Sequence, residues 1–292
     1  MLPARLNSAN GNDEPRRQTV LGRFLRNRRA VFGLLLLIGF CLMALLAPRI
    51  APFTADAQVL DDRLKPPGPI YRMGTDGLGR DILSRALYAS QVSIAIGIFA
   101  MLVAISVGVG VGMLAGYFGG WIDNILMRLT DMLLAFPTFF LLLTITTLFG
   151  RSIPILVLLL GLTSWGINAR IVRGQALAVK GEDFVLAARS IGASDFRLMI
   201  RHIFPNIVSI ILVDATLRVA LVILAEGGLS FLGLGVQPPT PSWGNMVADG
   251  GSLLRKAWWV SVFPGLFLFF CTISFNLVGD GLRDAFDPKF RR

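Results

Sequence analysis

Long stretches without a charged side chain constrain this sequence more than any other feature. The windows 30–48, 86–122, 132–150 and 152–169 contain no Asp, Glu, Lys or Arg. About 20 predominantly apolar residues cross the hydrocarbon core of a bilayer as a helix. Only 16% of all residues are charged, against about 25% in soluble domains. The chain is therefore predicted to be an all-α integral membrane protein.

Six transmembrane helices are expected, together forming one domain over residues 30–292. The window 86–122 is too long for one straight span, so its first residues are interpreted as an amphipathic lead-in. The fifth span is less apolar than the others, and the last begins at a Trp pair typical of the membrane interface. The expected spans are about 30–48, 93–118, 132–150, 152–169, 205–234 and 258–279.

Lysines and arginines predict the orientation of these spans. Most of the 28 basic residues fall in 1–29, 119–131, 170–204 and 280–292. The positive-inside rule places these segments, and so both termini, in the cytoplasm. The net charge of +10 follows from this topology, which predicts contact with a lipid bilayer and needs no nucleic acid. Within the tail 1–29, the arginine-rich part from residue 16 is either an interfacial helix or a simple basic flank.

Sequence signatures of catalysis and metal binding are missing. None of the lysines at 65, 180, 256 and 289 lies in the Gly-Lys-Ser/Thr sequence of a phosphate-binding loop. His202 is the single histidine, which excludes His-based metal sites. Cys41 and Cys271 fall inside expected spans and suggest no disulfide framework. We therefore expect no enzyme activity, metal or cofactor in this chain, and any use of ATP falls to a partner.

The polar segment 170–204 separates the fourth and fifth spans. Its apolar residues show helical spacing twice, at Phe184, Ala187, Ala188 and Ile191 and again at Phe196, Met199, Ile200 and Ile203. Gly192 interrupts the pattern, Ser194 and Asp195 favour a new helix start, and Pro205 is expected to restart the chain. Two short amphipathic helices on one side of a membrane predict a docking surface.

Close helix packing is predicted for the second span. Gly108, Gly112 and Gly116 recur at intervals of four residues and so share one helix face. Small residues on such a face allow another helix to approach closely. The glycines are therefore expected to serve packing.

The polar segment resembles the cytoplasmic EAA loop of ABC-importer permeases. The family pattern of Glu-Ala-Ala, Gly and Leu-Pro is matched by Leu186-Ala187-Ala188, Gly192 and Phe204-Pro205, with Leu186 in place of the Glu. Other stretches resemble the "C" permease subunits of the dipeptide/oligopeptide/nickel importers. They are Gly74-Thr75-Asp76, Gly79-Arg80-Asp81, Ser84-Arg85, Pro241-Ser242-Trp243-Gly244 and the segments 229–235 and 279–288.

This resemblance implies a MetI-like permease fold in a bacterial inner membrane. It also implies a heterodimer with a homologous permease subunit, two ABC ATPase subunits that bind ATP and Mg, and an extracytoplasmic substrate-binding protein. The expected function is to form half of a pore for dipeptides or oligopeptides, while nickel chelates and glutathione-like peptides stay open as cargo. A secondary transporter, which favours internal repeats and broken helices, and an intramembrane enzyme are the rival classes.

Two groups of residues are the candidates for function. Coupling to the ATPases is assigned to the loop 182–205, with an ordinary solvated loop as the alternative. Charged residues in the fifth span either line the translocation pathway or form an ion pair and a contact at the permease interface. Trp243 is expected to meet the binding protein or to anchor at the membrane interface. The coupling candidates are Phe184, Ala187, Ala188, Gly192, Ala193, Ser194, Asp195, Phe196 and Pro205, and the pathway candidates are Asp214, Arg218 and Glu226.

Overall fold

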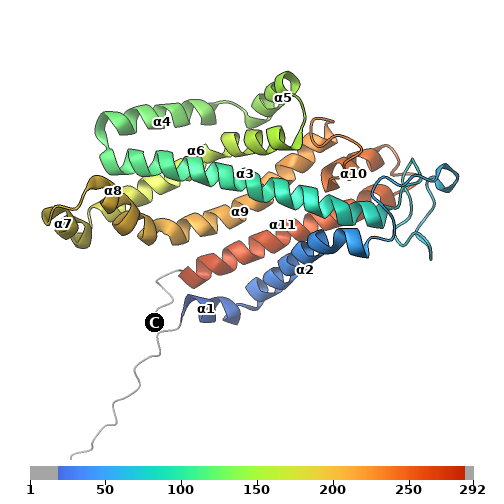
Figure 1. The fold of residues 1–292 in the computed structure, drawn as a ribbon, viewed down its shortest axis with the longest axis horizontal. Helices are drawn as coiled ribbons and strands as arrows, with labels where there is room; N and C mark the ends of the chain where they lie inside the picture. Colours follow the sequence, from blue (N-terminus) through green and yellow to red (C-terminus); the bar gives the residue numbers. More distant parts are fainter. Residues whose placement is uncertain (1–18, 287–292) are drawn as a thin grey trace, which may run out of the picture.

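The computed structural model describes residues 19–286, and the regular structure in this range is helical. The helices form an elongated bundle, with α7 (Asp183–Ser190) and α8 (Asp195–Arg197) at one end and α10 (Trp243–Gly251) at the other (Figure 1). The loop 51–81, which contains the 3-10 helix η1 (Leu60–Asp62), lies at the α10 end. The expectations for residues 1–18 and 287–292 fall outside the described residues.

Five helices of the described chain are long and apolar enough to cross a membrane. They are α2 (Arg28–Ile50), α3 (Ile82–Phe118), α6 (Ile153–Lys180), the continuous helix Asp195–Phe231 and α11 (Trp259–Phe286). A bent pair, α4 (Gly120–Ala135) and α5 (Thr138–Phe149), supplies a sixth crossing if it is counted as one span. The predicted all-α membrane fold is therefore confirmed.

Helix α3 is one unbroken helix, longer than the expected span 93–118. The side chain of Asp81 accepts a hydrogen bond from the amide of Ser84 and so caps its start, and Gly119, with φ +67°, ends it. At 1.5 Å per residue the helix is about 55 Å long, well beyond the 30 Å or so of a hydrocarbon core. The expected lead-in is thus the first part of the same helix.

The three glycines of α3 lie against α6. A Cβ atom at Gly112 would come within 2.4 Å of the carbonyl oxygen of Ala169, and one at Gly116 within 2.7 Å of that of Arg173. A Cβ atom at Gly108 would meet the Cβ of Asn168 at 2.7 Å. The backbones approach this closely only because no side chain lies between them, as the spacing predicts.

Helix α6 continues to Lys180, past the expected end of the fourth span at residue 169. Arg170 and Arg173, whose charges suggested the end of the fourth span, are paired with carboxylates of α4. Arg170 binds Asp131, and the guanidinium of Arg173 binds Asp123 through two hydrogen bonds, with Nη2 2.6 Å from Oδ2. Hydropathy registers these charges but not their partners, so it places the end of the helix too early.

The apolar window 132–150 lies on two helices instead of the expected straight one. The axes of α4 and α5 meet at 85°. The break falls at Phe136, whose ψ of 131° is extended, just before Pro137. A proline disfavours the helical conformation in the residue before it. Residues 120–131, expected to be a connecting segment, belong to α4.

The fifth span begins ten residues before Pro205, which was expected to restart the chain. Helix α8, the π-helix η2 (Leu198–Ile203) and α9 (Phe204–Phe231) follow one another without a break. Pro205 lies in the first turn of α9. A proline ring lacks an N–H donor and crowds the carbonyl of the preceding turn, and the wider hydrogen-bond spacing of a π-turn leaves room for it. The helix therefore continues through the proline.

A short helix, α1 (Val20–Arg26), precedes the first span. Phe24 is buried against α11, and the side chain of Asn27 accepts hydrogen bonds from the amides of Arg29 and Ala30 at the start of α2. The side chains of Leu21 and Leu25, one helical turn apart, are exposed. A helix therefore occurs in the arginine-rich segment, for which the sequence allowed either an interfacial helix or a basic flank. Its place at a membrane interface stays a prediction.

Candidate functional site

A compact element of α7, α8 and η2 covers one end of the bundle. Val185 and Ala188 of α7 are buried, and so are Leu198 and Ile203 of η2. They pack in one cluster with residues of α3 and α6 that include Met113, Tyr117, Val172 and Ala176. The element is therefore anchored to the ends of two long helices.

The outer side of this element is apolar and exposed. Ile191 is 88% exposed, the highest value among the large apolar side chains of residues 19–286, and Phe196 is 71% exposed. Phe184, Leu186 and Ile200 are also exposed. Exposed apolar residues grouped in this way mark interaction surfaces. We call these five residues the apolar docking face.

Each of the two expected amphipathic faces contains both buried and exposed residues. In the first face, Ala188 is buried whereas Phe184, Ala187 and Ile191 are exposed. In the second, Met199 and Ile203 are buried whereas Phe196 and Ile200 are exposed. The expectation that each set forms one face is corrected, because each helix packs on the bundle with one side and presents apolar residues on another. Leu186, which stands where the family pattern has Glu, contributes to the docking face.

The bend between α7 and α8 lies at Gly192, as its place in the sequence suggests. Gly192 has φ +87°, a conformation that strongly favours glycine. The amide of Ala193 donates to the carbonyl of Ala188, and the hydroxyl of Ser194 accepts a hydrogen bond from the amide of Arg197. Asp195 begins α8, and the exposed Pro205 lies in the first turn of α9, directly after η2. These contacts fix the direction in which the docking face points.

A tyrosine that the sequence analysis missed joins this element to α3. The hydroxyl of Tyr117 donates to Oδ1 of Asp195 and accepts a hydrogen bond of 2.8 Å from Nη2 of Arg189. The ammonium group of Lys180 donates to the carbonyl oxygen of Tyr117. No short motif in the sequence signals this network, because Tyr117 lies more than 60 residues before its partners.

Asp214 and Arg218, candidates for the pathway, form an ion pair within α9. Nε of Arg218 lies 2.7 Å from Oδ2 of Asp214, and both side chains are partly exposed. Asp214 also lines a narrow cleft between α3, α6 and α9 together with Asn168. Asn168 is buried, and neither its amide nitrogen nor its oxygen has a hydrogen-bond partner among residues 19–286. The ion pair fits the intrahelical alternative, and its partial exposure leaves the pathway role as a prediction.

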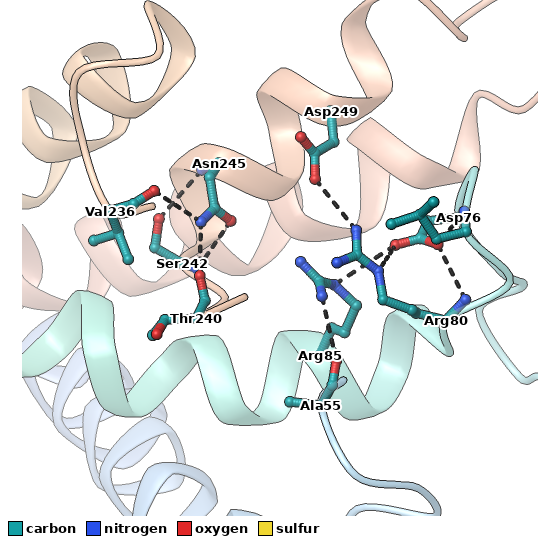
Figure 2. Close-up of polar contacts among 10 residues, drawn as sticks. Ala55, Asp76, Arg80, Arg85, Val236, Thr240, Ser242, Asn245 and Asp249 are labelled. Carbon is teal, nitrogen blue, oxygen red and sulfur yellow. Dashed lines mark hydrogen bonds and ion pairs between the residues drawn. The ribbon is translucent and has the colours of Figure 1, made fainter. Parts of the chain in front are cut away.

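Glu226 is enclosed within the chain. Its side chain is 0% exposed, and Oε1 accepts hydrogen bonds from the hydroxyls of Ser230, at 2.6 Å, and Ser242, at 2.9 Å. Ser242 in turn caps α10 in a reciprocal arrangement with Asn245 (Figure 2). In this conformation Glu226 therefore holds α9 to α10, which fits the structural alternative, and its role in the pathway stays a prediction.

A second polar network lies beside α10, at the start of α3 (Figure 2). Asp76 accepts hydrogen bonds from the amide and, at 2.7 Å, from Nε of Arg80. Nη2 of Arg80 lies 3.6 Å from Asp249 in α10, and Nη1 of Arg85 donates to the carbonyl of Ala55. The side chain of Asp249 is 45% exposed, and its partial desolvation raises the pKa of its carboxyl group, although both arginines act against this shift. The network fastens the loop 51–81 to α3 and α10.

Trp243, expected to contact the binding protein or the membrane interface, is instead fully buried. Its indole nitrogen donates to the carbonyl of Ala86, and its amide donates to the hydroxyl of Ser93. Both expectations for Trp243 are therefore corrected, because the indole ring fills the space between α10 and α3. The motif residues at 74–85 and 241–244 thus build the fold at this end of the bundle.

Thiol and metal-ligating side chains form no cluster among the described residues. Cys41 and Cys271 are free thiols, and no group of three or more His, Cys, Asp or Glu side chains in residues 19–286 is placed to hold a metal ion. The features that stand out are the apolar docking face, the Tyr117 network and the polar contacts around α10. They suit a membrane component that binds other proteins.

The fold and these surfaces define a multi-pass α-helical membrane protein with an interaction surface at one end. The family model of the binding-protein-dependent transport system inner membrane component matches residues 108–292, and that of the N-terminal TM domain of oligopeptide transport permease C matches residues 16–67. The chain belongs to the family of binding-protein-dependent transport system inner membrane components. The MetI-like fold inferred from sequence resemblance is the fold of this family.

Curated relatives match nearly the whole chain. The oligopeptide transport system permease protein OppC of Mycobacterium tuberculosis is 42% identical over 278 residues, which cover 94% of this chain and 96% of the relative. The dipeptide transport system permease protein DppC of Bacillus subtilis is 40% identical, with 92% and 85% covered. The glutathione transport system permease protein GsiD of Pectobacterium atrosepticum is 41% identical, with 92% and 90% covered.

Proposed function

We propose that this chain is a permease subunit of an ATP-driven ABC importer for dipeptides or oligopeptides. It would form half of a translocation pore in a bacterial inner membrane, together with a homologous permease subunit, with both termini in the cytoplasm. The observation that carries this proposal is the apolar docking face, held firmly against α3 and α6 at one end of the bundle. Family membership and the charge distribution of the sequence support it.

The docking face would be the surface that the ATPases bind. The sequence contains no phosphate-binding loop, so ATP and Mg would be bound by two partner ATPase subunits. A helix that presents apolar residues such as Ile191 and Phe196 fits a groove on a partner protein. Closure of the ATPases around ATP would move the segment 182–205 and switch the pore between outward and inward access. A substrate-binding protein would deliver cargo at the α10 end.

Peptides are the cargo that the relatives favour. Two of them carry oligopeptide and dipeptide transport in their names. Glutathione-like peptides are a second candidate, because a relative of almost equal identity is named for glutathione transport. Both candidates share a peptide backbone with charged ends, so one machine of this kind suits either.

Reconstitution tests the proposal. The chain is purified with the second permease and the two ATPases of its source, placed in liposomes and supplied with the binding protein and labelled di-, tri- and pentapeptides or glutathione. We expect uptake that requires ATP and the binding protein, and competition among peptides identifies the preferred class. Uptake that follows an ion gradient without ATPases would instead show a secondary transporter, and failure to bind ATPases would refute the assignment.

A further inference from the structure

We infer that Tyr117 is a positioning residue that makes α3 turn together with the docking element. This inference rests on the proposed function, because it assigns a route for the movement that the ATPases would produce. The docking element itself lies at residues 183–203, whereas Tyr117 is in the last turn of α3. The side chain of Tyr117 is only 2% exposed, so its contacts are made inside the protein.

The hydroxyl of Tyr117 joins the two sides of the bend at Gly192. Arg189, at the end of α7, donates to it at 2.8 Å, and it donates to Asp195 at the start of α8. The hydroxyl thus lies between a cation and an anion that are separated along the chain by the bend. Hydrogen bonds to charged groups are shorter and stronger than those between neutral groups, so this arrangement fixes α7, α8 and α3 relative to one another.

The ring and the backbone of Tyr117 add contacts from two further sides. The ammonium group of Lys180 and the guanidinium of Arg189 lie 5.5 Å and 5.6 Å from the ring centroid, within the range of cation–π attraction. Lys180, the last residue of α6, also donates to the carbonyl oxygen of Tyr117. The ends of α3 and α6 and both sides of the bend therefore meet at one side chain.

Directional contacts matter here because the other contacts between the docking element and α3 are apolar. Val185, Ala188 and Leu198 pack against the bundle through dispersion contacts, which do not by themselves fix a rotation. Hydrogen bonds depend steeply on angle. A tilt of the docking element is therefore passed to α3 in a defined direction through the hydroxyl of Tyr117.

Helix α3 then reaches the opposite end of the bundle without a break. Its first turns hold Trp243 of α10 through the carbonyl of Ala86 and the hydroxyl of Ser93. A rotation of α3 imposed at Tyr117 thus reaches the α10 end of the bundle, where cargo would enter. Tyr117 is the point at which one rigid helix joins the docking element to α10.

The variant Tyr117→Phe tests the inference, since it keeps the ring and removes the hydroxyl. In the reconstituted complex we expect normal recovery of ATPase subunits and continued ATP hydrolysis, with about a fivefold or greater loss of peptide imported per ATP hydrolysed. Tyr88→Phe, in the same helix but outside this network, is the matched control and should keep the ratio of the unmodified complex. An unchanged ratio in Tyr117→Phe would overturn the inference.

A double-mutant cycle separates coupling from a structural effect. If Tyr117 acts through Asp195, the pair Tyr117→Phe and Asp195→Asn should lower the ratio no further than the more damaging single change. Additive losses would show that the two residues act independently and would contradict the inference. Should Tyr117→Phe fail to assemble, the exposed Arg189→Gln tests the same network with the ring in place, and a normal ratio in it would again overturn the inference. Failure of the unmodified complex to import peptides would refute the proposed function instead.

Discussion

The hydroxyl of Ser242, at the start of α10, donates a hydrogen bond of 2.9 Å to the buried carboxyl group of Glu226 in α9. Ser230 binds the same oxygen and also accepts a hydrogen bond from the amide of Val236. A Cβ atom at Gly235 would lie 1.9 Å from the Ser230 hydroxyl, so this position must be glycine. Residues of the segment 229–244 thus surround one carboxyl group.

Replacing Glu226 distinguishes its structural role from a role in the pathway. Glu226→Gln keeps an oxygen acceptor for both serines, and we expect a change in stability within about 1 kcal/mol and normal uptake. Glu226→Ala leaves two buried hydroxyls without their acceptor and opens a cavity, and we expect a loss of about 2–4 kcal/mol. Thermal unfolding of the purified chain in detergent measures both. A folded Glu226→Gln variant of normal stability that no longer transports would instead favour the pathway.

Asp249 predicts a dependence of stability on pH at the α10 end. Partial desolvation raises the pKa of its carboxyl group above the ordinary value of 3.8. Above pH 3.8 the folded chain therefore retains a proton that the unfolded chain has released, and the contribution of Asp249 to stability falls as pH rises through this window. We expect Asp249→Asn to be more stable than the unmodified chain at pH 7.

The pH series provides the control for this prediction. The advantage of Asp249→Asn should shrink as the pH falls, because the raised pKa lets the carboxyl group of the unmodified folded chain take up its proton before that of the unfolded chain. Melting temperatures measured between pH 4.5 and pH 7.5, in steps of about half a unit, follow the trend. A variant that is less stable at pH 7 would show that the pairing of Asp249 with Arg80, at 3.6 Å, outweighs the cost of partial desolvation.

The membrane helices could be predicted because hydropathy depends on local composition. The ends of the spans could not be placed in the same way. Arg170 and Arg173 look like the end of a helix in the sequence, but α4 supplies their carboxylate partners. Pro205 resembles a break, but the preceding π-helix accommodates it. In both cases the deciding contact is a property of the folded chain that no hydropathy window contains.

The candidate site also contains features that local sequence predicts and others that depend on tertiary contacts. The bend at Gly192 and the cap at Ser194 follow from local chemistry and were predictable. Which side of α7 is buried depends on where α3 and α6 lie, and the spacing of apolar residues alone did not reveal it. Tyr117 lies 78 residues from Asp195 in the chain, so only the tertiary structure brings them together.

The unpartnered amide of Asn168 predicts a stabilising substitution. A buried polar group without a hydrogen bond costs about 1–3 kcal/mol, and leucine has a similar volume without this cost. We expect Asn168→Leu to raise the melting temperature of the purified chain and to leave uptake unchanged. A lower melting temperature would mean that the amide has a bound partner in the cleft beside Asp214. Higher stability combined with lost uptake would show that the amide is needed in another conformation.

Gly192 should be required for coupling but not for insertion into the membrane. A Cβ atom there would meet nothing within 4 Å, so the cost of Gly192→Val comes from φ +87°, a conformation that disfavours other residues by roughly 1–2 kcal/mol. We expect the bend to open, ATPase binding to weaken and peptide uptake per ATP to fall, while the amount of chain in the membrane stays the same. Gly174→Ala is the matched control, since Gly174 is equally open but helical, and alanine is favoured there. Normal uptake and ATP hydrolysis in Gly192→Val would show that the bend has no part in coupling.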